Sequence, residues 1–135
     1  MQNDKKILVV DDSRGWLDFH ESALKQIYGD EFIIDKANSA RSGYDAVYNN
    51  LSNPYKLIIS DLQMELDFEP EYAGEWFIGQ VRKLAQCNRT KIIIISATYN
   101  IRIIARSLQV KCLPKAIAAR DLTSYKLAMD ELLKG

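Results

Sequence analysis

The chain has 135 residues, a length typical of one compact domain, and 47% of them are hydrophobic, enough for a buried core. Its 18 basic and 18 acidic residues cancel, which argues against a dedicated nucleic-acid binder or a polybasic membrane module. Two cysteines are too few for a disulfide framework, and no apolar stretch approaches the roughly 18 residues of a membrane span. We therefore expect one cytoplasmic domain over residues 1–135, without direct contact to nucleic acid or membrane.

Four short apolar runs predict β-strands that are covered on both faces. They lie at residues 7–10, 32–34, 57–59 and 92–95. All four are rich in β-branched residues and lack the polar alternation of a half-exposed strand, as is typical of a parallel sheet. A fifth, weaker run lies at 110–113, where Lys111 interrupts the apolar pattern.

Helical patterns separate these runs, as crossovers between parallel strands require. The expected helices run from the N-cap Ser13 to Gly29, over about 40–51 and 73–85, onward from Asn100, and from the N-cap candidate Asp121 to Leu133. The third should bury a stripe of Trp76, Phe77, Val81 and Leu84. Strict alternation predicts an α/β fold, a (βα)5 doubly wound five-stranded parallel sheet.

Polar residues follow the carboxyl ends of the predicted strands, where doubly wound sheets bind their ligands. They are Asp11 and Asp12, Asp61, Ser96 with Thr98, and Lys115. Three carboxylates within a few ångströms repel one another unless a cation lies among them, and all-oxygen ligands suit Mg²⁺.

A lysine and a hydroxyl opposite such an ion would neutralise and hold the oxygens of a phosphoryl group. A carboxylate can itself attack phosphorus, and Asp61 is the best candidate because it follows the predicted central strand. Lys111 is the alternative to Lys115, and Ser96 has the alternative role of a helix cap. His20, the single histidine, should pack at the edge of the first helix rather than perform chemistry.

Four short motifs resemble those of response-regulator receiver domains of two-component signalling, in the family's order and at nearly its spacing. They are KILVVDDS at 6–13, LIISDL at 57–62, IISA at 94–97 and LPK at 113–115. The resemblance covers essentially the whole chain. It implies the receiver architecture, which flavodoxin-like proteins share, and a regulatory phosphoprotein rather than an enzyme acting on an external substrate.

The resemblance also assigns roles to the polar residues. Asp61 would accept phosphoryl from a phosphohistidine on a histidine kinase or a histidine phosphotransfer protein. Asp12, Asp61 and the Gln63 carbonyl would ligate Mg²⁺ directly, while Asp11 would act largely through water. Ser96 and Lys115 would contact the phosphoryl oxygens, and the side chains of Gln63 and Thr98 would tune the lifetime of the phosphorylated form.

Several positions depart from the family pattern. Glu65 replaces a usual Pro, and Gly74 arrives thirteen residues after Asp61, so this loop is longer than usual. Ala116 replaces the usual Pro after the lysine, and Cys112 stands where Tyr or Phe is common. These departures favour one alternative, a pseudo-receiver that signals without phosphorylation. A second alternative, a flavodoxin-like cofactor binder, is disfavoured because a doubly acidic loop repels phosphate.

Charge is unevenly distributed along the chain. Residues 61–75 hold six acids and no base, and residues 80–120 hold nine bases and no acid. The acidic segment is expected to select the phosphodonor that docks beside the site. On the helix after Asn100, a buried stripe leaves Ile103 exposed between Arg102 and Arg106, which marks a candidate surface for a downstream protein or a second copy.

Overall fold

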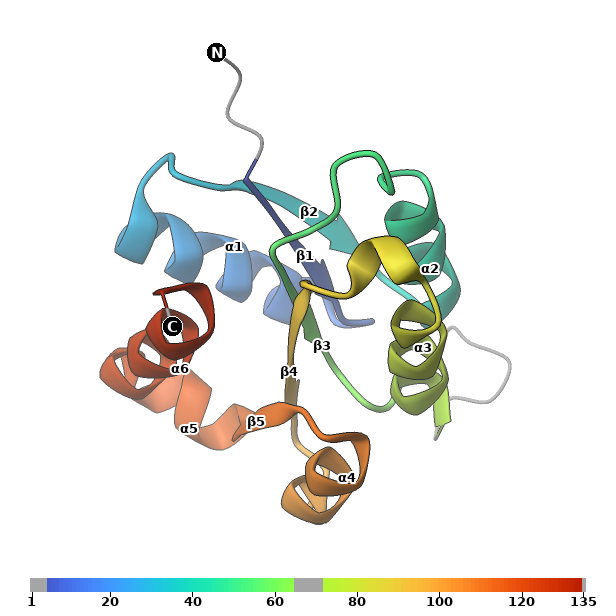
Figure 1. The fold of residues 1–135 in the computed structure, drawn as a ribbon. Helices are drawn as coiled ribbons and strands as arrows, with labels where there is room; N and C mark the ends of the chain where they lie inside the picture. The colour runs from blue at the N-terminus through green and yellow to red at the C-terminus, as the bar shows by residue number, and fades with distance from the viewer. Residues whose placement is uncertain (1–4, 65–71, 135) are drawn as a thin grey trace.

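The computed structural model describes residues 5–64 and 72–134 and contains a five-stranded parallel sheet in the order β2-β1-β3-β4-β5 (Figure 1). The strands are β1 (Lys6–Val10), β2 (Ile33–Ala37), β3 (Leu57–Ser60), β4 (Lys91–Ser96) and β5 (Lys111–Pro114). From β1 the chain passes to β2 at one edge of the sheet, then returns to β3 on the other side of β1 and continues through β4 to β5 at the opposite edge. The predicted doubly wound parallel sheet is therefore confirmed.

Helices cover both faces of this sheet (Figure 1). They are α1 (Arg14–Tyr28), α2 (Ala40–Tyr48), α3 (Ala73–Arg82), α4 (Ile101–Leu108), α5 (Lys115–Arg120) and α6 (Leu122–Lys134), with a short 3-10 helix, η2 (Ala85–Cys87), after α3. Leu8 and Ile58 pack toward α2, α3 and α4, while Ile7 and Ile59 pack toward α1, α5 and α6. No helix in these described ranges is long and apolar enough to cross a membrane.

The strand at 32–34 was predicted to be covered on both faces, and this prediction is wrong. The observed β2 begins at Ile33, whose exposed fraction is 45%, and among the described strands it pairs only with β1. The cause is its place at the edge of the sheet, where one side of the strand faces solvent. The three central strands, by contrast, are buried as expected.

Two helix predictions also need correction. Trp76 does not join the buried stripe of α3: it is exposed, and its ring lies against Tyr44 of α2 with centroids 5.9 Å apart. Residues 115–120 form the additional helix α5, because Asp121 caps α6 by accepting backbone hydrogen bonds from Thr123 and Ser124 and so separates the two helices.

A buried histidine joins α1 to α6. The exposed fraction of His20 is 1%, and its Nδ1 lies 2.8 Å from the Tyr125 hydroxyl with which it shares a hydrogen bond. Burial, followed by the charge of Lys115, lowers the pKa of His20 to about 3. His20 therefore lies inside the core as a neutral side chain rather than at the edge of α1.

This burial predicts an acid-sensitive fold. Below pH 6.5 His20 binds a proton in the unfolded chain but stays neutral in the folded chain. The free energy of unfolding therefore falls as the pH decreases toward 3. At pH 5 the loss should be about 2 kcal/mol relative to pH 8. Urea unfolding of the wild type and of His20→Gln across this range measures it. Parallel pH profiles of the two proteins would contradict the expectation.

Candidate functional site

The register of the central strands brings Asp11 and Asp61 together. Val10 pairs with Ser60, and each aspartate is the next residue along its strand. Their backbone amides continue the ladders, since Asp11 N donates to Ala37 O at 3.1 Å and Asp61 N donates to Val10 O at 2.9 Å. Both carboxylates are therefore fixed at the carboxyl edge of the sheet, and both are buried.

Asp12 completes a cluster of three carboxylates. One oxygen from each of Asp11, Asp12 and Asp61 lies within 4.8 Å of the others. Backbone amides hold the two buried members: Ser13 N donates to Asp11 Oδ1 at 2.9 Å, and Leu62 N donates to Asp61 Oδ1 at 2.7 Å. Each carboxylate keeps its Oδ2 for another partner.

That partner is Lys115, the first residue of α5. Its Nζ lies 2.8 Å from Asp61 Oδ2 and 2.9 Å from Asp11 Oδ2, and the lysine side chain is only 12% exposed. Burial alone would lower the pKa of Lys115, but the hydrogen bond and charge of Asp61, followed by the nearby Asp11 carboxylate, raise it above its ordinary value. Lys115 therefore stays an ammonium at neutral pH.

The charge balance at Asp11 differs. Burial raises the pKa of Asp11 above its ordinary value; the Ser13 hydrogen bond opposes this rise, and the charge of Asp61 adds to it. Asp11 Oδ2 is buried and has no hydrogen-bond partner, so its approach to Lys115 Nζ is an ion pair without hydrogen-bond geometry.

The cluster fits a divalent cation. Lys115 supplies one positive charge to a group of three carboxylates, so a divalent cation would offset the remaining negative charge. Three carboxylates without a thiolate or imidazole are the donor set that Mg²⁺ prefers. Gln63 lies two residues beyond Asp61 with its side chain exposed, and the role of its carbonyl stays a prediction.

The hydroxyl predicted for the site reaches the same edge of the sheet. Ser96 ends β4, is buried, and pairs with Pro114, the neighbour of Lys115. Its Oγ lies 3.0 Å from Thr98 Oγ1 and accepts a hydrogen bond from Thr98 N at 3.3 Å. Ser96 and Lys115 line one pocket of about 480 Å³ beside α4. Since Asn100 precedes α4, Ser96 is not the cap of that helix.

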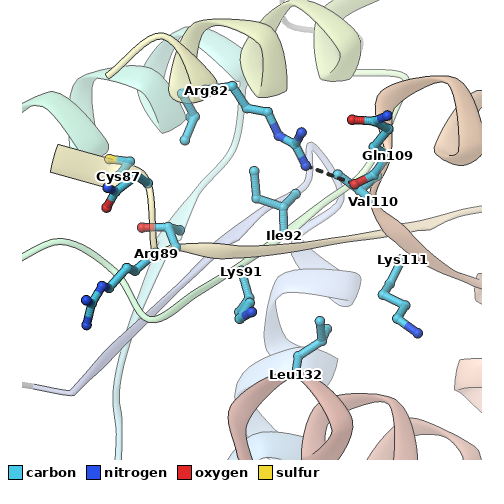
Figure 2. A pocket seen from close by; sticks show the side chains of 12 residues that line it. Arg82, Cys87, Arg89, Lys91, Ile92, Gln109, Val110, Lys111 and Leu132 are labelled. Atoms are coloured by element: carbon cyan, nitrogen blue, oxygen red, sulfur yellow. Dashed lines mark hydrogen bonds between the residues drawn. The ribbon is translucent and has the colours of Figure 1, made fainter. Parts of the chain in front are cut away.

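A second pocket, of about 410 Å³, lies at the opposite end of β4 and β5 (Figure 2). None of its described lining residues is acidic. Two of its basic side chains have structural partners: Arg82 donates to the carbonyl of Gln109 at 3.0 Å, and Lys111 forms an ion pair with Glu131 on α6. Lys111 therefore lies away from the carboxylates, and Lys115 is the site lysine.

Two residues that contact the site or its backbone were not recognised from the sequence. Gly74 N donates to Leu62 O at 2.9 Å, and a Cβ on Gly74 would lie 2.3 Å from Asp61 O. Trp16 lies beside Lys115, with the ammonium 5.0 Å from the ring centroid. The position of Gly74, thirteen residues after Asp61, is evident in the sequence, but its role there is not. Nothing in the sequence pattern indicates the contact between Trp16 and Lys115.

The predicted partner surface is exposed. Ile103 is 72% exposed between the exposed Arg102 and Arg106, while Ile101 and Ala105 of the same helix are buried. Tyr99, in the loop before α4, is 96% exposed. Four of the predicted acids, Glu65, Asp67, Glu69 and Glu71, lie outside the described residues, so the role of the acidic segment stays a prediction.

No protein-family model matches the sequence, and no curated protein matches it either. Solved structures do match. A response regulator receiver domain protein from Clostridium thermocellum is 22% identical, with a TM-score of 0.74 over 96% of this chain and 94% of that one. Chemotaxis protein CheY4 of Vibrio cholerae is 19% identical, with a TM-score of 0.74 over 96% and 98%.

The signal receiver domain of a DNA-binding response regulator from Colwellia psychrerythraea 34H is 14% identical, with a TM-score of 0.77 over 97% of this chain and 99% of that one. Identities this low establish shape rather than shared chemistry. Across nearly its full length, the chain has the fold of response regulator receiver domains.

Proposed function

We propose that the protein is a phosphoacceptor receiver of a two-component or phosphorelay system, with Asp61 as the acceptor. The observation that carries this proposal is the position of the Lys115 ammonium between the buried Asp11 and Asp61, beside a third carboxylate. A carboxylate, a cation and a divalent-metal site at one strand edge are the parts that phosphoryl transfer needs.

The transfer is an in-line displacement at phosphorus. One Asp61 oxygen bonds to phosphorus as the bond between phosphorus and the donor imidazole nitrogen breaks, and that nitrogen keeps the electron pair. A bound Mg²⁺ would offset the negative charge that gathers among the carboxylates and the phosphoryl group. Attack by water on phosphorus later releases phosphate and restores the Asp61 carboxylate.

The remaining polar groups position the phosphoryl oxygens. Lys115 donates to them after leaving its carboxylate partners, and the Ser96 hydroxyl, now held beside Thr98, donates from the neighbouring strand. Asp11 and Asp12 would hold the metal with Asp61, together with the Gln63 carbonyl. The protein thus acts as a regulatory switch whose two states differ in the contacts of Lys115 and Ser96.

The partners follow from this chemistry. The donor is a phosphohistidine on a histidine kinase or a histidine phosphotransfer protein. The output surface is the exposed patch of Tyr99, Arg102, Ile103 and Arg106, which adjoins the pocket that Lys115 lines. A downstream protein or a second copy of the chain would bind there, because an apolar side chain between two arginines offers both contact area and charge.

Mass measurement after incubation with Mg²⁺ and acetyl phosphate tests the proposal. The wild type should gain the mass of one phosphoryl group, and Asp61→Asn should gain none because it lacks the nucleophilic carboxylate. Asp45→Asn, at an exposed aspartate of α2, is the matched control and should gain the same mass as the wild type.

The alternative, a pseudo-receiver that signals without phosphorylation, predicts a different result. Ala116 after the lysine, Cys112 and the lengthened loop are the sequence features that favour it. An unmodified wild-type protein, or equal labelling of Asp61→Asn, would replace the phosphoacceptor proposal by this one.

A further inference from the structure

An aromatic cluster connects the site lysine to two helices that carry no site residue. The Trp16 ring lies under the Lys115 ammonium and packs against Phe19 and His20, with centroids 5.0 and 5.6 Å away. His20 in turn shares its hydrogen bond with Tyr125 of α6. The proposed phosphoryl chemistry uses none of these rings.

The indole supplies a third contact to the ammonium. Two carboxylates attract Lys115 Nζ at 2.8 and 2.9 Å, and the face of Trp16 attracts it through the negative potential of the ring. The lysine side chain is only 12% exposed, so solvent weakens this attraction little. A four-carbon stem has many rotamers, and contact with a rigid ring reduces the number that Lys115 can adopt.

The indole is itself held in place. Trp16 lies in the first turn of α1, where its backbone N donates to the Ser13 hydroxyl at 3.2 Å. Its ring contacts His20, which Tyr125 anchors from α6. Because His20 is neutral in the folded protein, it places no second positive charge near the ammonium.

We propose that Trp16 is a positioning residue that holds the Lys115 ammonium between Asp11 and Asp61. Through His20 and Tyr125, the packing of α1 against α6 then sets where the ammonium lies. The inference deepens the proposed function, since Lys115 is the group that would contact the phosphoryl oxygens. Its geometric part concerns the metal-free protein and can be tested without phosphorylation.

The first experiment measures this contact directly. The chain has two tryptophans, so Trp76→Phe leaves Trp16 as the only indole. In chelator at pH 7, adding Lys115→Met to this background should change the emission intensity of Trp16, because a cation no longer lies against the ring. Lys36→Met, which removes a lysine paired with Asp18 and Glu21 of α1, is the control and should leave the emission unchanged. Equal emission with and without Lys115 would overturn the proposal.

The second experiment measures the consequence for the reaction. Trp16→Leu should slow labelling by acetyl phosphate about three- to tenfold, the range expected for loss of one cation–π contact. Trp16→Tyr keeps an aromatic face and should recover most of the rate, and thermal unfolding confirms that both variants are folded. If folded Trp16→Leu were labelled at the same rate as the wild type, the positioning role would be overturned. If the wild type takes up no phosphoryl group, the proposed function fails and the emission experiment alone decides this inference.

Discussion

Replacing Gly74 by alanine will lower the free energy of unfolding by about 3 kcal/mol, which is the upper end of the typical cost of overpacking. The added Cβ would lie 2.3 Å from Asp61 O and 2.6 Å from Leu62 Cα. Both obstacles are backbone atoms, so no side-chain rotation relieves the clash. Either α3 moves away from the sheet, or the peptide after Asp61 moves and takes the Asp61 carboxylate with it.

Gly79→Ala is the matched control for this substitution. Gly79 lies in the same helix, and a Cβ there would meet no atom within 4 Å. Alanine at this position should raise stability by about 0.5–1 kcal/mol, because it loses less conformational entropy in a helix than glycine. Urea unfolding measures both variants. Equal stability of Gly74→Ala and the wild type would show that α3 shifts at no cost.

Lys115→Met should lower the free energy of unfolding by about 3 kcal/mol in the presence of a chelator. Methionine keeps an unbranched side chain, one heavy atom shorter, but leaves Asp11 and Asp61 buried without their cation. The loss should be smaller at high Mg²⁺ concentration, because a divalent ion bound to the folded state replaces the missing charge. Thermal or urea unfolding with and without Mg²⁺ gives both numbers.

Lys25→Met is the comparison for the lysine substitution. Lys25 is exposed and pairs with Glu21 at 3.3 Å on the surface of α1. Its loss should cost less than about 1 kcal/mol, since exposed ion pairs contribute little to stability. If Mg²⁺ stabilised neither Lys115→Met nor the wild type, the three carboxylates would not be a metal site.

The sheet could be predicted because each central strand is marked by a short apolar run in the sequence. Continuous apolar runs such as 57–59 and 92–95 indicated buried parallel strands, and the structure places both in the centre of the sheet. Failures arose where position in the fold overrides the local pattern. β2 is exposed because it lies at an edge, and Trp76 is apolar yet faces outward against Tyr44.

The candidate site divides in the same way. Its carboxylates and lysine follow strand ends, so a rule about strand ends located Asp11, Asp61 and Lys115 together. Trp16 contacts Lys115, which lies 99 positions further along the chain, and Gly74 lies against Asp61, which lies 13 positions earlier. No local sequence pattern encodes such contacts. The assigned roles of Gln63 and Thr98 come from family resemblance alone and stay predictions.

Lys115 contacts two parts of the molecule at once: it lines the pocket beside α4, and its ammonium lies over the Trp16 ring of α1. A ligand in the α4 pocket that favours one position of this ammonium would also favour or weaken its contact with Trp16, and a change at Trp16 would in turn alter the affinity for that ligand. The position of this one cation would thereby couple binding beside α4 to the packing of Trp16, without any rearrangement of the sheet between them.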